Sequence, residues 1–138
     1  KDWSLVTDRT SHYAFHTTRN QPGREGILTA YVTGDKADVL AAQNGAMRQK
    51  MIAADLQFAH PNTQQTVRGF FSQSWQRDAL TQGAYALFRP GQWFGLRPIL
   101  SRPHGNVLFA GEHLADWQGF MEGAINTGED AADLVLGK

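Results

Sequence analysis

The last third of the chain carries the pattern that most limits what it can fold into. Residues 106–110 (NVLFA) form a short, continuously apolar run, typical of a strand buried on both faces of a sheet. Gly111 and Glu112 follow directly, and a loop leads to residue 119. From there small and apolar residues recur at helical spacing, which predicts one face formed by Met121, Ala124, Ile125, Gly128, Ala132 and Val135. The segment is therefore predicted to form a strand, a loop and a helix.

Such a junction is suited to meeting the polar edge of a ligand. The N–H groups of a first helical turn have no acceptor within the helix, so they can face a phosphate or a carbonyl group. Small residues at Gly119, Gly123 and Ala124 would let a flat ligand approach the backbone. The same residues could equally serve close packing of helix on strand, and the spacing alone favours that structural interpretation.

The first half of the chain predicts a hairpin followed by a helix. Residues 13–17 and 26–33 are rich in β-branched and aromatic side chains, and the sequence Asn-Gln-Pro-Gly at 20–23 has the composition of a turn. Apolar residues near helical spacing then predict a helix over 35–58 with Asp35 as its N-cap. This helix should stop before Pro61, because the residue preceding a proline avoids the α region.

The middle of the chain is less regular. Residues 66–71 and 84–88 are expected to be strands, the second of them ending at Pro90. Residues 92–102 fit either a short helix or an irregular covering segment.

Composition excludes several classes of function. Thirteen basic and thirteen acidic residues cancel over 138 residues, which argues against nucleic acid or an anionic membrane held by bulk charge. Zero cysteines exclude disulfides and thiolate metal sites, and the five histidines lack metal-ligand spacing, so no metal site is expected. No apolar run approaches the roughly 18 residues that a membrane span needs. The sequence does not indicate the cellular compartment.

Residues 108–135 (LFAGEHLADWQGFMEGAINTGEDAADLV) closely resemble the C-terminal FAD-binding signature of the flavin amine oxidases, a family that includes monoamine oxidases and L-amino-acid oxidases. The signature is an apolar strand, G-x-E, a loop with an aromatic, then G-aromatic-M-E-G-A and a small-residue helix. Weaker similarity covers residues 75–92 and 7–35, so the resemblance spans nearly the whole chain.

The resemblance implies a fold that is α/β plus α+β, as the C-terminal piece of a two-domain FAD oxidase. Residues 1–100 would belong to a mixed-sheet substrate-binding domain. Residues 101–138 would supply the strand, loop and helix of a Rossmann-like FAD domain that is completed in trans.

The resemblance also implies cofactor contacts. Glu112 matches an acidic residue near the FAD ribose and diphosphate, and the amide of Met121 would donate to the pyrimidine carbonyl edge of the flavin. The full set implied to bind the cofactor is Trp75, Gly111, Glu112, Gly119, Phe120, Met121 and Ala124. For each aromatic residue in the set, an ordinary place in the core is the structural alternative.

Three residues are implied to contact substrate. Phe120 matches an aromatic wall beside the substrate, and Tyr85 falls where the family lines its pocket. His16 (or Phe15) stands near a family tyrosine that helps hold the substrate carboxylate, and this departure puts carboxylate recognition at that point in question. No residue of this chain is assigned as catalytic.

Other family features do not occur in this sequence. The G-x-G-x-x-G turn that binds the ADP half of FAD has no counterpart here, and in the family a lysine near flavin N5 and a carboxylate-binding arginine lie in earlier segments. We therefore expect a partner: one or more N-terminal polypeptides of the same enzyme. The start at Lys1 suggests proteolytic processing of a precursor or an expressed fragment, and processing is favoured, giving a hetero-oligomer.

The implied activity is oxidative deamination of an amino acid to a 2-oxo acid, ammonia and hydrogen peroxide, with O2 as the oxidant. The Thr7-Asp8 start and the hairpin favour an amino-acid substrate, whereas M-E-G-A favours a monoamine. The amino-acid reading is preferred. A monoamine or polyamine oxidase, or a non-catalytic fragment, remains the alternative.

Overall fold

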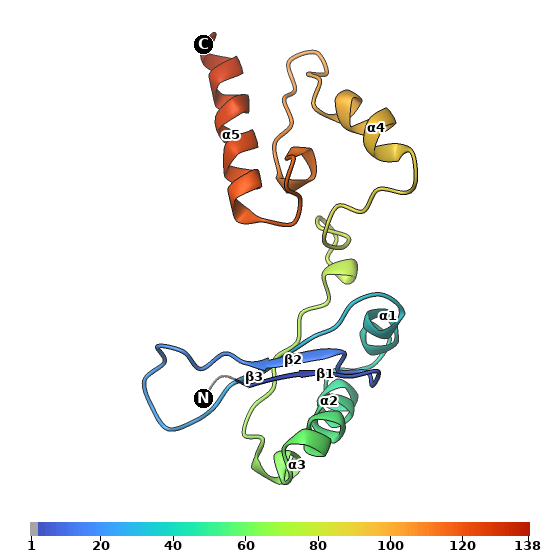
Figure 1. Ribbon diagram of the computed structural model, residues 1–138, viewed down its shortest axis with the longest axis vertical. Coiled ribbons are helices and arrows are strands. Elements are labelled where there is room, and N and C mark those ends of the chain that lie inside the picture. The colour runs from blue at the N-terminus through green and yellow to red at the C-terminus, as the bar shows by residue number, and fades with distance from the viewer. Residues whose placement is uncertain (1–2) are drawn as a thin grey trace. The chain divides into compact units, whose positions relative to one another are not determined.

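The computed structural model describes residues 3–138, which form two compact units, one ending at Leu80 and the other spanning residues 81–138 (Figure 1). Each unit is described by itself below. The boundary expected at residue 100 refers to domains of a complete enzyme and stays a prediction. Within the described residues, no helix is both long and apolar enough to cross a membrane.

The first unit is built on a three-stranded antiparallel sheet in the order β1-β2-β3. The strands are β1 (Ser4–Val6), β2 (Tyr13–His16) and β3 (Leu28–Tyr31). The predicted hairpin is confirmed, since β2 and β3 pair directly, with Tyr13 opposite Tyr31. Strand β1, which the sequence pattern did not predict, pairs with the other edge of β2.

The prediction of one continuous helix over 35–58 is wrong, because the structure has two helices there. They are α1 (Asp35–Ala41) and α2 (Gly45–Ala59). The break arises at Asn44, whose extended backbone and side-chain oxygen cap the second helix by accepting from the Met47 N–H at 2.9 Å. Asp35 is the first helical residue rather than the cap, which is Gly34. The predicted end is confirmed, because His60 is extended.

The core of the first unit is small and lies between the sheet and α2, which runs along one face of the sheet in Figure 1. The Asp55 carboxylate on α2 accepts a hydrogen bond from the Ser11 N–H at 2.8 Å and lies 3.7 Å from an Arg9 guanidinium nitrogen. This polar contact joins the helix to the turn between β1 and β2. The buried apolar residues of the unit are Ala14, Leu40, Ala41, Ala53 and Leu56.

The strand predicted over 66–71 is wrong. The helix α3 (Thr63–Thr66) occupies its first residue, and the Thr66 hydroxyl donates to the Asn62 carbonyl at 3.0 Å. Val67 and Ser74 are extended, but residues 67–74 pair with no strand among the described residues before the short 3-10 helix η1 (Trp75–Arg77). Extended backbone without a neighbouring strand forms no ladder.

The second unit contains α4 (Gln92–Leu100), the 3-10 helix η2 (Glu112–Leu114) and α5 (Met121–Leu136). The predicted C-terminal helix is confirmed, and of the two alternatives for residues 92–102 the structure has the short helix. The Arg97 side chain attaches α4 to η2, because it donates to the Leu114 carbonyl at 3.2 Å and pairs with Asp116. Its guanidinium also lies 5.0 Å from the centre of the Trp93 ring.

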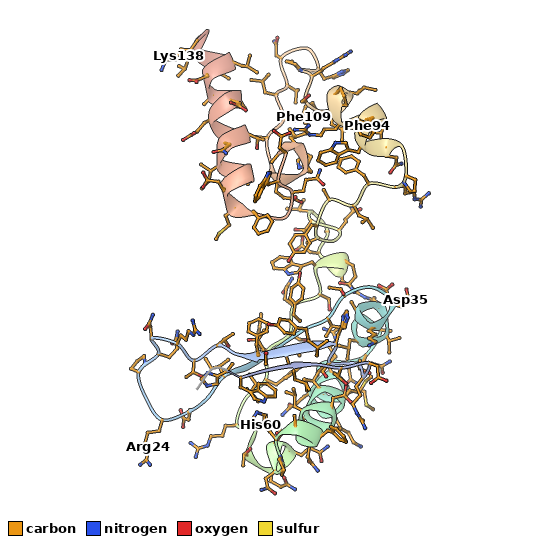
Figure 2. All side chains as sticks on the ribbon, viewed as in Figure 1. Arg24, Asp35, His60, Phe94, Phe109 and Lys138 are labelled. Carbon is orange, nitrogen blue, oxygen red and sulfur yellow. The ribbon has the colours of Figure 1, made fainter. Side chains whose placement is uncertain are left out.

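The strands predicted over 84–88 and 106–110 are wrong for the described chain. In this unit the described residues form only one isolated bridge, between His104 and Val107. A strand of the doubly buried kind needs neighbours on both sides, and none is present here. Phe109, on the segment between α4 and α5, is therefore exposed (Figure 2).

The apolar face predicted for α5 is only partly covered. Of its members, Ala124 and Gly128 are partly buried, whereas the buried Gly123 lies outside the predicted face. Within the described chain the larger members of the face remain exposed, at 85% for Met121, 56% for Ile125 and 74% for Val135.

Candidate cofactor site

The site is centred on the turn that enters α5. Gly119 has φ +80, a conformation that glycine adopts without strain. A Cβ atom at this position would lie 3.4 Å from the Tyr85 ring, so the ring packs directly on the Gly119 backbone. The structure thus brings together a residue implied to bind the cofactor and one implied to contact substrate, although 34 positions separate them.

Glu112 holds this turn from the other side. One carboxylate oxygen accepts from the Gly119 N–H at 2.6 Å, and the other accepts from the Ala86 N–H at 2.9 Å. Both oxygens of the partly buried carboxylate are therefore engaged by the chain's own backbone. The expected contact of Glu112 with the FAD ribose and diphosphate stays a prediction.

Gly111 is fixed by Thr127 on α5. The Thr127 hydroxyl accepts from the Gly111 N–H at 2.9 Å and has the carbonyl oxygens of Gly111, Gly123 and Ala124 each at 3.1 Å as acceptors for its single proton. Gly111 itself has φ +147, and a Cβ there would meet the His113 ring at 2.6 Å. The end of the 106–110 segment is thereby attached to the helix.

Gly123 permits the close approach of α5 to the η2 loop. A Cβ at Gly123 would lie 2.5 Å from the Ala115 Cβ and 2.8 Å from the Trp117 carbonyl oxygen. Distances this short require the helix or the loop to move. The structural role that spacing favoured for this glycine is therefore borne out.

The N-terminus of α5 is open. Its cap residue, Phe120, is extended, and within the described residues no side chain caps the helix. The amides of the first turn lack an acceptor within the helix, and the Phe120 side chain is 63% exposed. Free donors flanked by small residues fit the polar carbonyl edge of a flavin, so the residues present suit this cofactor.

Two predicted residues belong to the first unit. Trp75 lies on η1 and its side chain is 52% exposed. His16 ends β2, where its Nε2 lies 2.6 Å from the Thr18 hydroxyl oxygen. Their approach to the α5 turn stays a prediction. No group of acidic or histidine side chains suited to a metal occurs among the residues that the structure describes.

Sequence reasoning missed Thr127 and the backbone of Ala86. A signal for Thr127 was available, since it follows Gly123 by four positions and Ala124 by three, which places it on the covered side of the helix. The Ala86 N–H carries no sequence signal, because any residue except proline supplies the same donor.

Thr127 gives a test of the attachment between Gly111 and α5. Replacing Thr127 by Val keeps the shape but leaves the Gly111 N–H without its acceptor, so we expect a loss of about 1–3 kcal/mol in the free energy of unfolding. Thr127→Ser should retain most of the stability because it retains the hydroxyl. Chemical denaturation of the flavin-loaded enzyme measures both, and equal stability of the Val variant and the parent would contradict the role.

Comparison with known proteins agrees with this geometry. The family described as "Flavin containing amine oxidoreductase" matches residues 4–136. The chain therefore belongs to the flavin-containing amine oxidoreductases, and the cofactor of the family is FAD.

Individual relatives have related names. The chain is 32% identical over 114 residues to an L-amino acid dehydrogenase of Synechocystis, covering 81% of this chain and 24% of the relative. It is 28% identical to an L-amino-acid oxidase of Vipera ammodytes ammodytes, covering 92% and 27%. The chain thus spans about a quarter of the length of these relatives.

Solved structures give the same fold. Wild-type putrescine oxidase bound to putrescine superposes with a TM-score of 0.78 at 24% sequence identity, over 94% of this chain and 29% of that one. The predicted similarity of the fold to that of flavin amine oxidases is confirmed. The described chain combines helices with one small three-stranded sheet.

Proposed function

We propose that this chain is the C-terminal part of an FAD-dependent L-amino-acid oxidase, which converts an amino acid to a 2-oxo acid, ammonia and hydrogen peroxide. The observation that carries the proposal is the uncapped start of α5, where exposed Phe120 and Met121 follow the Glu112-bound turn. Relatives named L-amino-acid oxidase and L-amino acid dehydrogenase support the choice of substrate class.

The residues of this chain would hold the cofactor and shape the substrate pocket, and they would not transfer protons. When bound, FAD supplies the acceptor for the hydride removed from the substrate carbon. The Met121 N–H would donate to the pyrimidine edge of the flavin, and a donor there stabilises negative charge on the reduced ring. Gly111, Gly119 and Ala124 would permit the close approach of the cofactor, while Phe120 and Tyr85 would form walls of the substrate pocket.

The proposed oxidase needs further polypeptide, which would carry the dinucleotide-binding motif, the lysine near the flavin and the carboxylate-binding arginine. Association of such segments after processing of a precursor is part of the proposal. The exposed side of α5 and the segment 106–110, which joins no sheet within the described residues, support it, because both present apolar side chains suited to packing in a larger domain.

Purification of this chain by itself tests the need for a partner. The isolated chain should carry no flavin and should show no absorbance in the flavin bands, because it offers only the ring-side contacts. Addition of the N-terminal polypeptide should produce a yellow complex. Stoichiometric FAD on the isolated chain would contradict the proposal.

A peroxide-coupled assay of the assembled enzyme tests the substrate class. Amino acids should give peroxide at a kcat/KM at least tenfold above that of the amines formed by removing their carboxylate. Preference for amines, including putrescine, would favour the alternative of a monoamine or polyamine oxidase, which the putrescine-bound structural relative supports. A flavin-free assembly would instead indicate a non-catalytic fragment.

A further inference from the structure

One carboxylate in the second unit joins three separate segments of the chain. Glu112 lies on η2, and its two oxygens accept from the backbone of Ala86 and of Gly119. The two N–H donors thus lie on different segments, one beside Tyr85 and the other beside Phe120.

The contact is supported by direct packing beside it. The Tyr85 ring lies against the Gly119 backbone, where a Cβ would be 3.4 Å away. Ala86 follows Tyr85 and Phe120 follows Gly119, so each hydrogen bond of Glu112 fixes the backbone next to one aromatic residue. Glu112 therefore joins the backbone segments that carry the two aromatic side chains.

The chemistry of the bond requires a carboxylate. An ionised carboxylate offers acceptors on both oxygens, and hydrogen bonds to it are stronger than those between neutral groups. A glutamine of the same shape has one acceptor oxygen and one NH2 group, which would face a backbone N–H donor. One of the two bonds must then be lost, while the size of the side chain is kept.

From this arrangement we infer that Glu112 is a positioning residue that sets the width of the substrate pocket between Tyr85 and Phe120. The inference rests on the proposed function for the meaning of the pocket. The bonds themselves are independent of that function. Glu112 acts through the backbone of two neighbours and is not a catalytic residue.

The test compares Glu112→Gln with the parent in the assembled flavoenzyme. Amide hydrogen exchange in segments 84–88 and 118–121 should accelerate by about tenfold in at least one segment, because one charge-assisted bond is lost. KM should rise several-fold for substrates with large side chains and less for small ones, with kcat changed less than KM.

Glu129→Gln is the matched control. Glu129 is exposed on α5, loses the same charge on substitution, and takes no part in the proposed site. Its exchange rates and kinetic constants should equal those of the parent. If Glu112→Gln is not obtained as folded enzyme, Glu112→Asp supplies the second variant, since its shorter side chain keeps the charge but cannot span both donors.

The outcomes separate the inference from the proposed function. Unchanged exchange in both segments of Glu112→Gln, or of Glu112→Asp when only that variant folds, would overturn the inference. Loss of flavin with unchanged exchange would also overturn it and assign Glu112 to direct cofactor contact. A parent enzyme that forms no peroxide from amino acids would remove the proposed function, while faster exchange would still establish the positioning bonds.

Discussion

Replacing Gly123 by Ala should destabilise the protein by about 1–3 kcal/mol, although alanine is the better helix former. The added Cβ would lie 2.5 Å from the Ala115 Cβ and 2.8 Å from the Trp117 carbonyl oxygen. Neither atom is the flexible end of a long side chain, so the helix must move away from the η2 loop. Because the same movement disturbs the turn at Gly119, flavin should be released at a lower temperature.

Gly95→Ala provides the control for the Gly123 variant. Gly95 lies inside α4 in the same unit, is exposed, and would have no described atom within 4 Å of its new Cβ. Without a clash, helix propensity should stabilise this variant by about 0.5–1 kcal/mol. Thermal release of flavin fluorescence from the assembled enzyme measures both changes, and a Gly123 variant as stable as the Gly95 variant would refute the close packing.

Replacing Phe120 by Ala should alter substrate choice far more than folding. The side chain is 63% exposed, so its removal leaves little cavity in this unit. If it forms a wall of the pocket, the loss of one aromatic contact should lower kcat/KM for the preferred substrate by tenfold or more, which corresponds to about 1.4 kcal/mol in the transition state. Steady-state kinetics over amino acids of different size would show which substrates depend on the wall.

Phe120→Tyr and the flavin absorbance spectrum are the controls for the Phe120→Ala variant. A tyrosine keeps the aromatic surface, so its kinetic constants should stay within a few-fold of the parent. The absorbance spectrum should show that both variants retain FAD. An Ala variant with unchanged selectivity would show that Phe120 does not line the pocket.

The sequence predicted those elements whose pattern of residues lies within the element itself. The hairpin of β2 and β3 follows from its β-branched strands and its turn residues, and α5 follows from a helical period over 16 residues. The residues that surround the α5 turn were identified through the family signature, since glycines and alanines at these positions are also ordinary packing residues.

The predictions that failed depend on distant partners or on a local bond that competes with the predicted element. Residues 106–110 have the composition of a buried strand, but the second unit contains no neighbouring strand to pair with it. The break between α1 and α2 depends on Asn44, whose capping bond competes with helix continuation. The two backbone donors within reach of the Glu112 carboxylate also have no sequence signal, while its contact with the cofactor stays a prediction.

The packing of Tyr85 on Gly119 has a consequence for protein engineering. Substitutions at contacting sites are commonly non-additive, and here the Tyr85 ring rests on the residue that precedes Phe120. Altering Tyr85 would therefore shift the scaffold from which Phe120 projects, so a beneficial change at one position would depend on the residue at the other. Directed evolution of substrate range should accordingly randomise the two codons together, because successive single-site libraries would miss their favourable combinations.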